Sequence, residues 1–154
     1  VERSRGLGDV YKRQFLYRLV FLLGLACVLL AISWCALCNS PAIVEICWMP
    51  AWLGRWADAY PMFRNFPAFA LLSFVATFAL MSWNVIQRTL NPLAVAIISW
   101  AGASLLGVGL EFAQLWIPSR SFDLLDIGWT LAGAFTGALL ALAIWTIVFK
   151  KNGR

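Results

Sequence analysis

The sequence predicts an all-α integral membrane protein: a bundle of four transmembrane helices, with a candidate short interfacial helix between the first and second spans. Of its 154 residues, 62% are hydrophobic and only 12% are charged, which is more apolar surface than a soluble domain of this size can bury. Four apolar runs are each long enough to cross about 30 Å of hydrocarbon, which takes roughly 20 helical residues. Backbone polar groups in lipid must bond within their own segment, so these runs are helices rather than strands.

The four spans are expected at residues 15–37, 66–86, 93–117 and 124–149. We assign the transmembrane domain to residues 15–154 and set residues 1–14 apart from it. The chain begins with Val1, and the stretch from Asp9 to Gln14 resembles a sequencing adapter read in frame. Residues 1–14 are therefore interpreted as an assembly scar, and a genuine basic tail is the alternative.

The connection between the first and second spans, residues 38–65, is longer than the two turns that follow. Pro50 is well placed to begin a short helix, because proline is tolerated at a first helical position. Trp52, Trp56 and Tyr60 would then share one face, which suits a helix lying at the level of the lipid headgroups. An irregular loop with interfacial tryptophans is the alternative.

Three cysteines lie around the end of the first span: Cys35, Cys38 and Cys47. On the outer side of a membrane, a disulfide between Cys38 and Cys47 could staple the loop, and the disulfide state is left open. The chain has no His, so it lacks the commonest metal ligand and can form no Ser–His or Cys–His pair. We predict no metal and no cofactor.

The distribution of Lys and Arg favours a topology with both termini in the cytoplasm. With four spans, both ends of the chain lie on one side, together with Arg18, Arg88, Lys150, Lys151 and Arg154. The other side holds fewer basic residues: Arg55, Arg64 and Arg120. Lys and Arg are enriched in cytoplasmic segments, so the more basic side is assigned to the cytoplasm.

The third and fourth spans carry polar residues near the same end. A carboxylate such as Glu111 inside a span costs several kcal/mol unless it is partnered, so it marks a functional site by default. Helical spacing puts Ser104, Gly107, Glu111 and Gln114 on one face of the third span. The same spacing puts Asp126, Thr130, Gly133 and Gly137 on one face of the fourth. We therefore expect the two spans to cross closely as an antiparallel hairpin through the helix-packing residues Gly107, Gly133 and Gly137.

This packing predicts one polar cluster near the outer membrane surface. The residues expected in it come from the start of the second span, the end of the third span, the turn and the start of the fourth: Arg64, Asn65, Glu111, Gln114, Arg120, Asp123 and Asp126. Buried carboxylates need donors, so Arg120 is expected within hydrogen-bond reach of Glu111, Asp123 or Asp126. A polar clasp that only holds the hairpin together is the alternative. A cation site on the carboxylates is disfavoured by Arg120.

The pattern Glu111-x-x-Gln114-x-x-x-Pro118-x-Arg120-x-x-Asp123-x-x-Asp126 resembles the signature of the VanZ-like membrane protein family. Arg64-Asn65-x-x-x-Phe69 is similar to a second motif of that family. The chain departs from the family pattern at Thr130, where Asn is usual, and at Leu71 and Ser73, where Pro and Gly are usual. The resemblance implies a polytopic protein of the bacterial cytoplasmic (inner) membrane, related to one linked to teicoplanin resistance.

Three functions are compatible with these residues. The first is a binding or protective protein at the cell envelope, whose outer-face pocket holds a lipid headgroup or an amphiphilic antibiotic. The second is a membrane-embedded enzyme in which Glu111 or Asp126 is the catalytic acid or base on a lipid-linked substrate. The third is a structural assembly partner. Membrane lipids are the expected partners and nucleic acid is not, because the basic residues flank apolar runs. The oligomeric state is left open.

Overall fold

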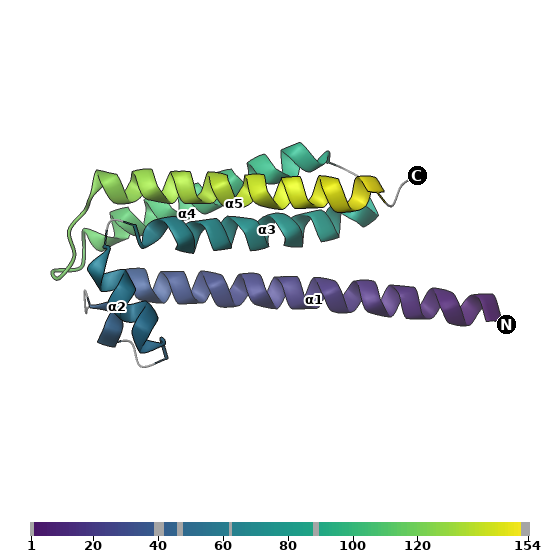
Figure 1. The fold of residues 1–154 in the computed structure, drawn as a ribbon, viewed down its shortest axis with the longest axis horizontal. Helices are drawn as coiled ribbons and strands as arrows, with labels where there is room; N and C mark the ends of the chain where they lie inside the picture. The colour runs from purple at the N-terminus through teal and green to yellow at the C-terminus, as the bar shows by residue number, and fades with distance from the viewer. Residues whose placement is uncertain (1, 39–41, 46–47, 62, 88–89, 152–154) are drawn as a thin grey trace.

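The protein is a bundle of helices in the computed structural model (Figure 1), which describes residues 2–38, 42–45, 48–61, 63–87 and 90–151. Every regular element within those ranges is helical. In chain order the elements are α1 (Glu2–Leu37), the short 3-10 helix η1 (Ile43–Glu45), α2 (Ala51–Ala59), α3 (Asn65–Gln87), α4 (Pro92–Gln114) and α5 (Leu124–Lys151).

Four of these helices are long and apolar enough to cross a membrane, which confirms the predicted fold class and describes a multi-pass membrane protein. The qualifying segments are Arg18–Leu37, Asn65–Trp83, Pro92–Gln114 and Leu124–Val148. α1 begins ahead of the predicted span, at Glu2. α1 begins and α5 ends at the same end of the bundle, and α2 lies at the opposite end, which we call the loop end (Figure 1).

α4 ends at Gln114, three residues before the predicted boundary at residue 117. The N–H groups of Leu115, Trp116 and Ile117 each donate to a carbonyl three residues earlier, at 3.2, 3.2 and 2.9 Å. Bonds of this kind tighten the last turn of a helix. Pro118 disfavours helical backbone in the residue before it, so the helix closes ahead of the proline.

α3 and α5 run in the same direction and form the most extensive helix–helix contact in the structure. A Cβ added at Gly133 would overlap the carbonyl oxygen of Phe66, and one at Gly137 would overlap that of Ala70. The two backbones therefore touch over a full turn of helix. This corrects the predicted packing, because Gly133 and Gly137 face α3 and not α4. A small-xxx-small face favours close approach of a neighbour without specifying which one.

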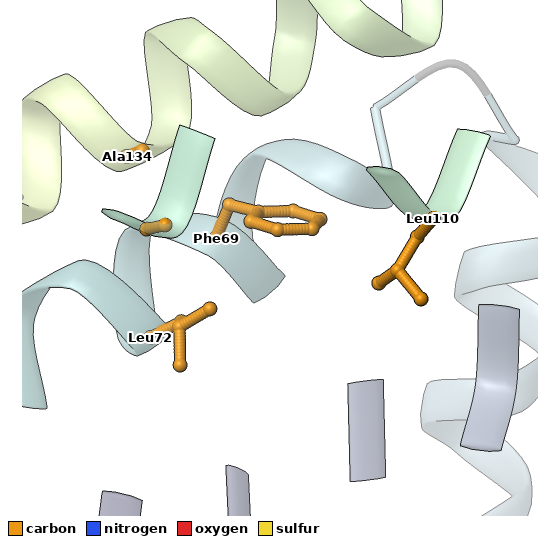
Figure 2. Close-up of a cluster of buried hydrophobic side chains, with 5 residues drawn as sticks. Phe69, Leu72, Leu110 and Ala134 are labelled. Carbon is orange, nitrogen blue, oxygen red and sulfur yellow. The ribbon is translucent and has the colours of Figure 1, made fainter. Parts of the chain in front are cut away.

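Gly107 does lie between α4 and α5, as predicted. A Cβ there would overlap the Thr130 methyl group on α5 and would lie 2.9 Å from the ring of Phe69 on α3. Phe69 belongs to a buried cluster that joins three helices (Figure 2), with Leu72, Ala103, Leu110 and Ala134. Figure 2 shows the Phe69 ring between Leu110 of α4 and Ala134 of α5.

α1 packs beside α3 in the opposite direction. Arg18 lies over the ring of Trp83 at 5.7 Å, and Phe21 stacks on Phe78 at 5.9 Å. Further along, Gly24 faces Val75. No residue of the α1 span is buried, whereas about a third of each other span is. α1 is thus the least enclosed of the four.

The predicted interfacial element is a helix, α2, and not an irregular loop. Pro50 is the N-cap of α2, whereas the sequence analysis expected it at the first helical position, one residue further along. The Pro50 carbonyl accepts the N–H of Gly54 at 3.1 Å. Asp58 of α2 accepts hydrogen bonds from the backbone N–H groups of Ile43 and Val44, at 2.8 and 3.0 Å. These bonds fix η1 against α2 across the loop.

Candidate functional site

A cavity of about 280 Å³ lies at the loop end of the bundle, where the ends of all four spanning helices meet η1 and α2. Its wall is mostly apolar, with residues such as Ile32 from α1, Trp56 from α2 and Leu71 from α3. Six of the seven residues predicted from the sequence line it as well: Arg64, Asn65, Glu111, Gln114, Arg120 and Asp126. Charged and amide side chains therefore share one space with apolar surface.

Glu111 and Gln114 face the cavity from the last turns of α4. They are three residues apart, so they share one face of the helix, and only 4% and 7% of their surfaces are exposed. The Glu111 carboxylate receives a backbone hydrogen bond from Asp123. Its second oxygen, Oε2, is buried and has no hydrogen-bond partner among the residues that the structure describes. Buried polar atoms in folded proteins nearly always have a hydrogen-bond partner, so an unpartnered carboxylate oxygen is unusual.

Arg64 and Asn65 enter the cavity at the start of α3. Asn65 is the first residue of the helix, and the Arg64 backbone N–H donates to the carbonyl of Tyr60 at 3.2 Å. The two residues line the cavity together with Glu111 and Gln114 from the last turns of α4. The Arg64 charge acts electrostatically on both Glu111 and Asp126.

Arg120 binds the end of α1, a contact that the sequence analysis did not anticipate. Its guanidinium donates to the carbonyl oxygens of Cys35 at 2.9 Å and Cys38 at 3.3 Å. A cation is favourable there because the last carbonyls of a helix lack partners and carry partial negative charge. Burial and the nearby Arg64 charge both lower the pKa of Arg120, burial more strongly. An arginine nevertheless stays protonated at neutral pH.

The two aspartates have different surroundings. Asp123 is not part of the cavity wall; its carboxylate accepts the N–H of Leu125 at 2.8 Å and so caps the start of α5. Asp126 lies in the first turn of α5 and lines the cavity. Of the two predicted aspartates, then, Asp123 orders the turn and Asp126 lies at the site. The predicted hydrogen bond between Arg120 and a carboxylate remains a prediction.

Like charges are close to one another in this cavity. Arg64 and Arg120 are near enough to repel, and so are Glu111 and Asp126. The formal charges of the two arginines and the two carboxylates add up to zero. An arrangement that brings like charges together in a partly buried space is costly unless other groups compensate them.

The sequence analysis did not predict that α1 and α2 contribute to the cavity wall. Cys35 of α1 and Trp56 and Ala57 of α2 line the cavity, although nothing in their spacing distinguished them from lipid-facing or interfacial residues. Cys35 and Cys38 are free thiols. The suggested disulfide from Cys38 involves Cys47, which lies outside the described residues.

Comparison of the chain with protein-family models, with curated proteins and with solved structures finds no match. Within the described ranges, no group of three or more His, Cys, Asp or Glu side chains is arranged to hold a metal ion. The chemistry of the cavity is therefore the basis for assigning a function.

Proposed function

We propose that this chain is a VanZ-like protein of the bacterial cytoplasmic membrane that binds the polar headgroup of an envelope lipid or a similar amphiphile. The observation that supports this most directly is the convergence of Arg64, Asn65, Glu111, Gln114, Arg120 and Asp126 on one cavity with an apolar wall. Binding sites for small molecules are commonly apolar with a few convergent polar groups. An amphiphile offers both kinds of surface.

Different residues of the cavity would recognise different parts of the amphiphile. The guanidinium of Arg64 meets an anionic group such as a phosphate, because charge-assisted hydrogen bonds of this kind are strong and directional. The amides of Asn65 and Gln114 add donors and acceptors. Apolar residues of the wall, such as Ile32 and Leu71, accommodate the adjoining hydrocarbon.

The proposed topology places the loop end outside and both termini in the cytoplasm. The excess of Lys and Arg at the terminal end supports it. In this orientation the cavity faces the envelope, where lipid-linked precursors and glycopeptide antibiotics are found. A role like that of the teicoplanin-resistance protein is then one of sequestering or shielding an amphiphile.

A membrane-embedded enzyme is the second candidate, and Glu111 is the reason to keep it. Glu111 lines a cavity of about 280 Å³, and a general acid or base must lie beside the space that its substrate occupies. Glu111→Gln should then abolish turnover of a lipid-linked substrate while the protein stays folded. In a structural clasp, the third candidate, the same variant should lose thermal stability.

The proposal is tested by identifying lipids that copurify with the protein. We expect mass spectrometry to find an amphiphile retained by the wild type and lost from Arg64→Gln. Arg55→Gln is the matched control, because Arg55 is exposed on α2 and lies outside the cavity wall. Equal retention by the wild type and both variants would overturn the proposal.

A further inference from the structure

The cavity reaches the surface of the molecule on its apolar side. The wall that α4 contributes is buried, as Leu110 shows with 8% of its surface exposed. Apolar wall residues of the neighbouring elements are exposed instead: Trp56 of α2 by 38% and Leu71 of α3 by 53%. A side chain that lines a cavity and is also exposed lies where the cavity opens. The opening is therefore on the side of α2 and α3.

α1 covers α3 at one end of their contact and leaves it uncovered at the other. Leu71, Val75 and Phe78 share one face of α3, since they are spaced four and three residues apart. α1 covers two of them, because Gly24 faces Val75 and Phe21 stacks on Phe78 at 5.9 Å. Leu71 lies one turn nearer the loop end and is exposed. The seam between α1 and α3 is thus closed toward the chain termini and opens at Leu71.

α1 supplies the other side of this opening. The two contacts just described set an antiparallel register, in which Ile32 of α1 lies at the level of Pro67 of α3. Both residues line the cavity, together with Ala36 of α1. Pro67 is exposed and lies one turn before Leu71. The opening is therefore bounded by Ile32 on one side and by Pro67 and Leu71 on the other.

The depth of the opening and the size of the cavity limit what can occupy it. Leu71 is six residues after Asn65, the first residue of α3, which is a rise of about 9 Å at 1.5 Å per residue into the spanning segment. The volume of about 280 Å³ is just below the range of roughly 300–1,000 Å³ found for sites that enclose a drug-sized ligand. The cavity can hold a compact headgroup, but it cannot also hold a long hydrocarbon chain or the head of a glycopeptide.

We propose that the seam between α1 and α3 is a lateral portal for a membrane lipid. The compact headgroup occupies the cavity beside Arg64, and the hydrocarbon chain leaves between Ile32 and Leu71 into the leaflet at the loop end. A lipid that enters sideways keeps its chain out of water throughout, which avoids the cost of exposing apolar surface. This inference rests on the proposed amphiphile binding; it names the ligand class, a lipid rather than a glycopeptide, and its route.

The test narrows the portal with a larger side chain. Delipidated protein is incubated with vesicles of the total polar lipids of the bacterial expression host and repurified, and the lipid retained per protein is measured by mass spectrometry. We expect Leu71→Trp to retain about tenfold less lipid than the wild type, a ratio within the cost of overpacking an occupied site. Leu105→Trp is the matched control, because Leu105 is 73% exposed on α4 and lies outside the cavity wall. It should retain the wild-type amount.

A second pair of variants tests the α1 side and decides the question if Leu71→Trp fails to fold. Ile32→Trp should lose the lipid, whereas Leu30→Trp, on an exposed residue outside the wall, should keep it. Wild-type retention in the folded portal variants, with loss in Arg64→Gln, would overturn the portal and leave amphiphile binding standing. Retention of teicoplanin, added as a second probe, in place of lipid would overturn the ligand class. No lipid or teicoplanin retained by the wild type would overturn both the portal and the proposed function.

Discussion

Replacing Gly137 with alanine should separate α3 from α5. The added Cβ would overlap the carbonyl oxygen of Ala70 and lie 2.8 and 3.0 Å from the carbonyl carbon and Cα of the same residue. All three are backbone atoms, so no side-chain rotation can relieve the overlap. One of the two helices has to move, and α3 also packs against α1 and α4.

The expected loss follows from the cost of overpacking, which is about 1–3 kcal/mol for extra methyl or methylene groups in a well-packed interior. For a chain of 150–250 residues, 1 kcal/mol shifts Tm by about 2–4 °C on the scale of soluble proteins. Relative to a glycine-to-alanine change elsewhere in α5, which gains the same helix propensity, Gly137→Ala should therefore lower Tm by about 2–12 °C. The measurement is thermal unfolding of the detergent-solubilised protein, followed by the fluorescence of its tryptophans.

Gly128→Ala is the matched control, because it adds the same methyl group to the same helix. A Cβ at Gly128 meets no heavy atom within 4 Å in the described structure. Alanine also favours helix over glycine, by about 1 kcal/mol, so this variant should be as stable as the wild type or more so. If Gly137→Ala melted within 1 °C of Gly128→Ala, a difference of about 0.25–0.5 kcal/mol and at most half of the smallest expected effect, the close α3–α5 contact would be refuted.

Three further predictions concern topology and the loop end. A cysteine introduced beside Arg55, in a background without native cysteines, should react with an impermeant thiol reagent in intact cells, while one beside Lys151 should not; the reverse pattern would contradict the proposed orientation. Arg120→Gln should loosen the end of α1 and raise the rate at which the Cys38 thiol is labelled, because two charge-assisted bonds worth about 1.5–3 kcal/mol each are lost; an unchanged rate would count against the contact. Asp58→Ala should speed hydrogen exchange at the Ile43 and Val44 amides, which lose their acceptor; exchange as slow as in the wild type would show that other groups protect them.

The four spans were predictable because lipid imposes a length and a composition that a sequence displays directly. The boundaries of α3 and α5 agree with the prediction within two residues. The end of α4 was missed by three residues, because an apolar run continues through Leu115 and Ile117 although the backbone has already begun to turn. Hydrophobicity does not report where a helix tightens ahead of a proline.

Helix pairing was less predictable than helix position. Gly133 and Gly137 were recognised as a close-packing face, but they were assigned to the sequence neighbour α4 and in fact meet α3. A face of small residues accepts any helix that brings a matching surface, and the choice depends on the whole bundle. The aromatic pairs at either end of this contact, Phe63 with Trp129 and Phe78 with Trp145, show the same parallel register, but only once the helices are placed.

The polar residues of the cavity could be predicted because buried charges are scarce in membrane spans and stand out in the sequence. The role of Arg120 could not be predicted, since its acceptors are backbone carbonyls in the last turn of α1 and just after it, more than 80 residues away. Every residue has a backbone carbonyl, so no pattern of side chains in the sequence predicts which carbonyl will accept the bond. The same reasoning explains why the role of Asp58, which accepts hydrogen bonds from two backbone N–H groups, could not be predicted.

The contact between Arg120 and α1 affects how the binding experiments should be read. Substitution of Arg120 removes hydrogen bonds that hold a wall of the cavity, so a lost ligand could follow from a displaced α1 as well as from a missing cation. Arg64 lines the same cavity without a side-chain hydrogen bond among the described residues. Its substitution by glutamine changes the charge and leaves the hydrogen bonds between Arg120 and the end of α1 intact. Ligand loss in Arg64→Gln with an unchanged Tm therefore identifies binding, whereas the same loss in Arg120→Gln does not.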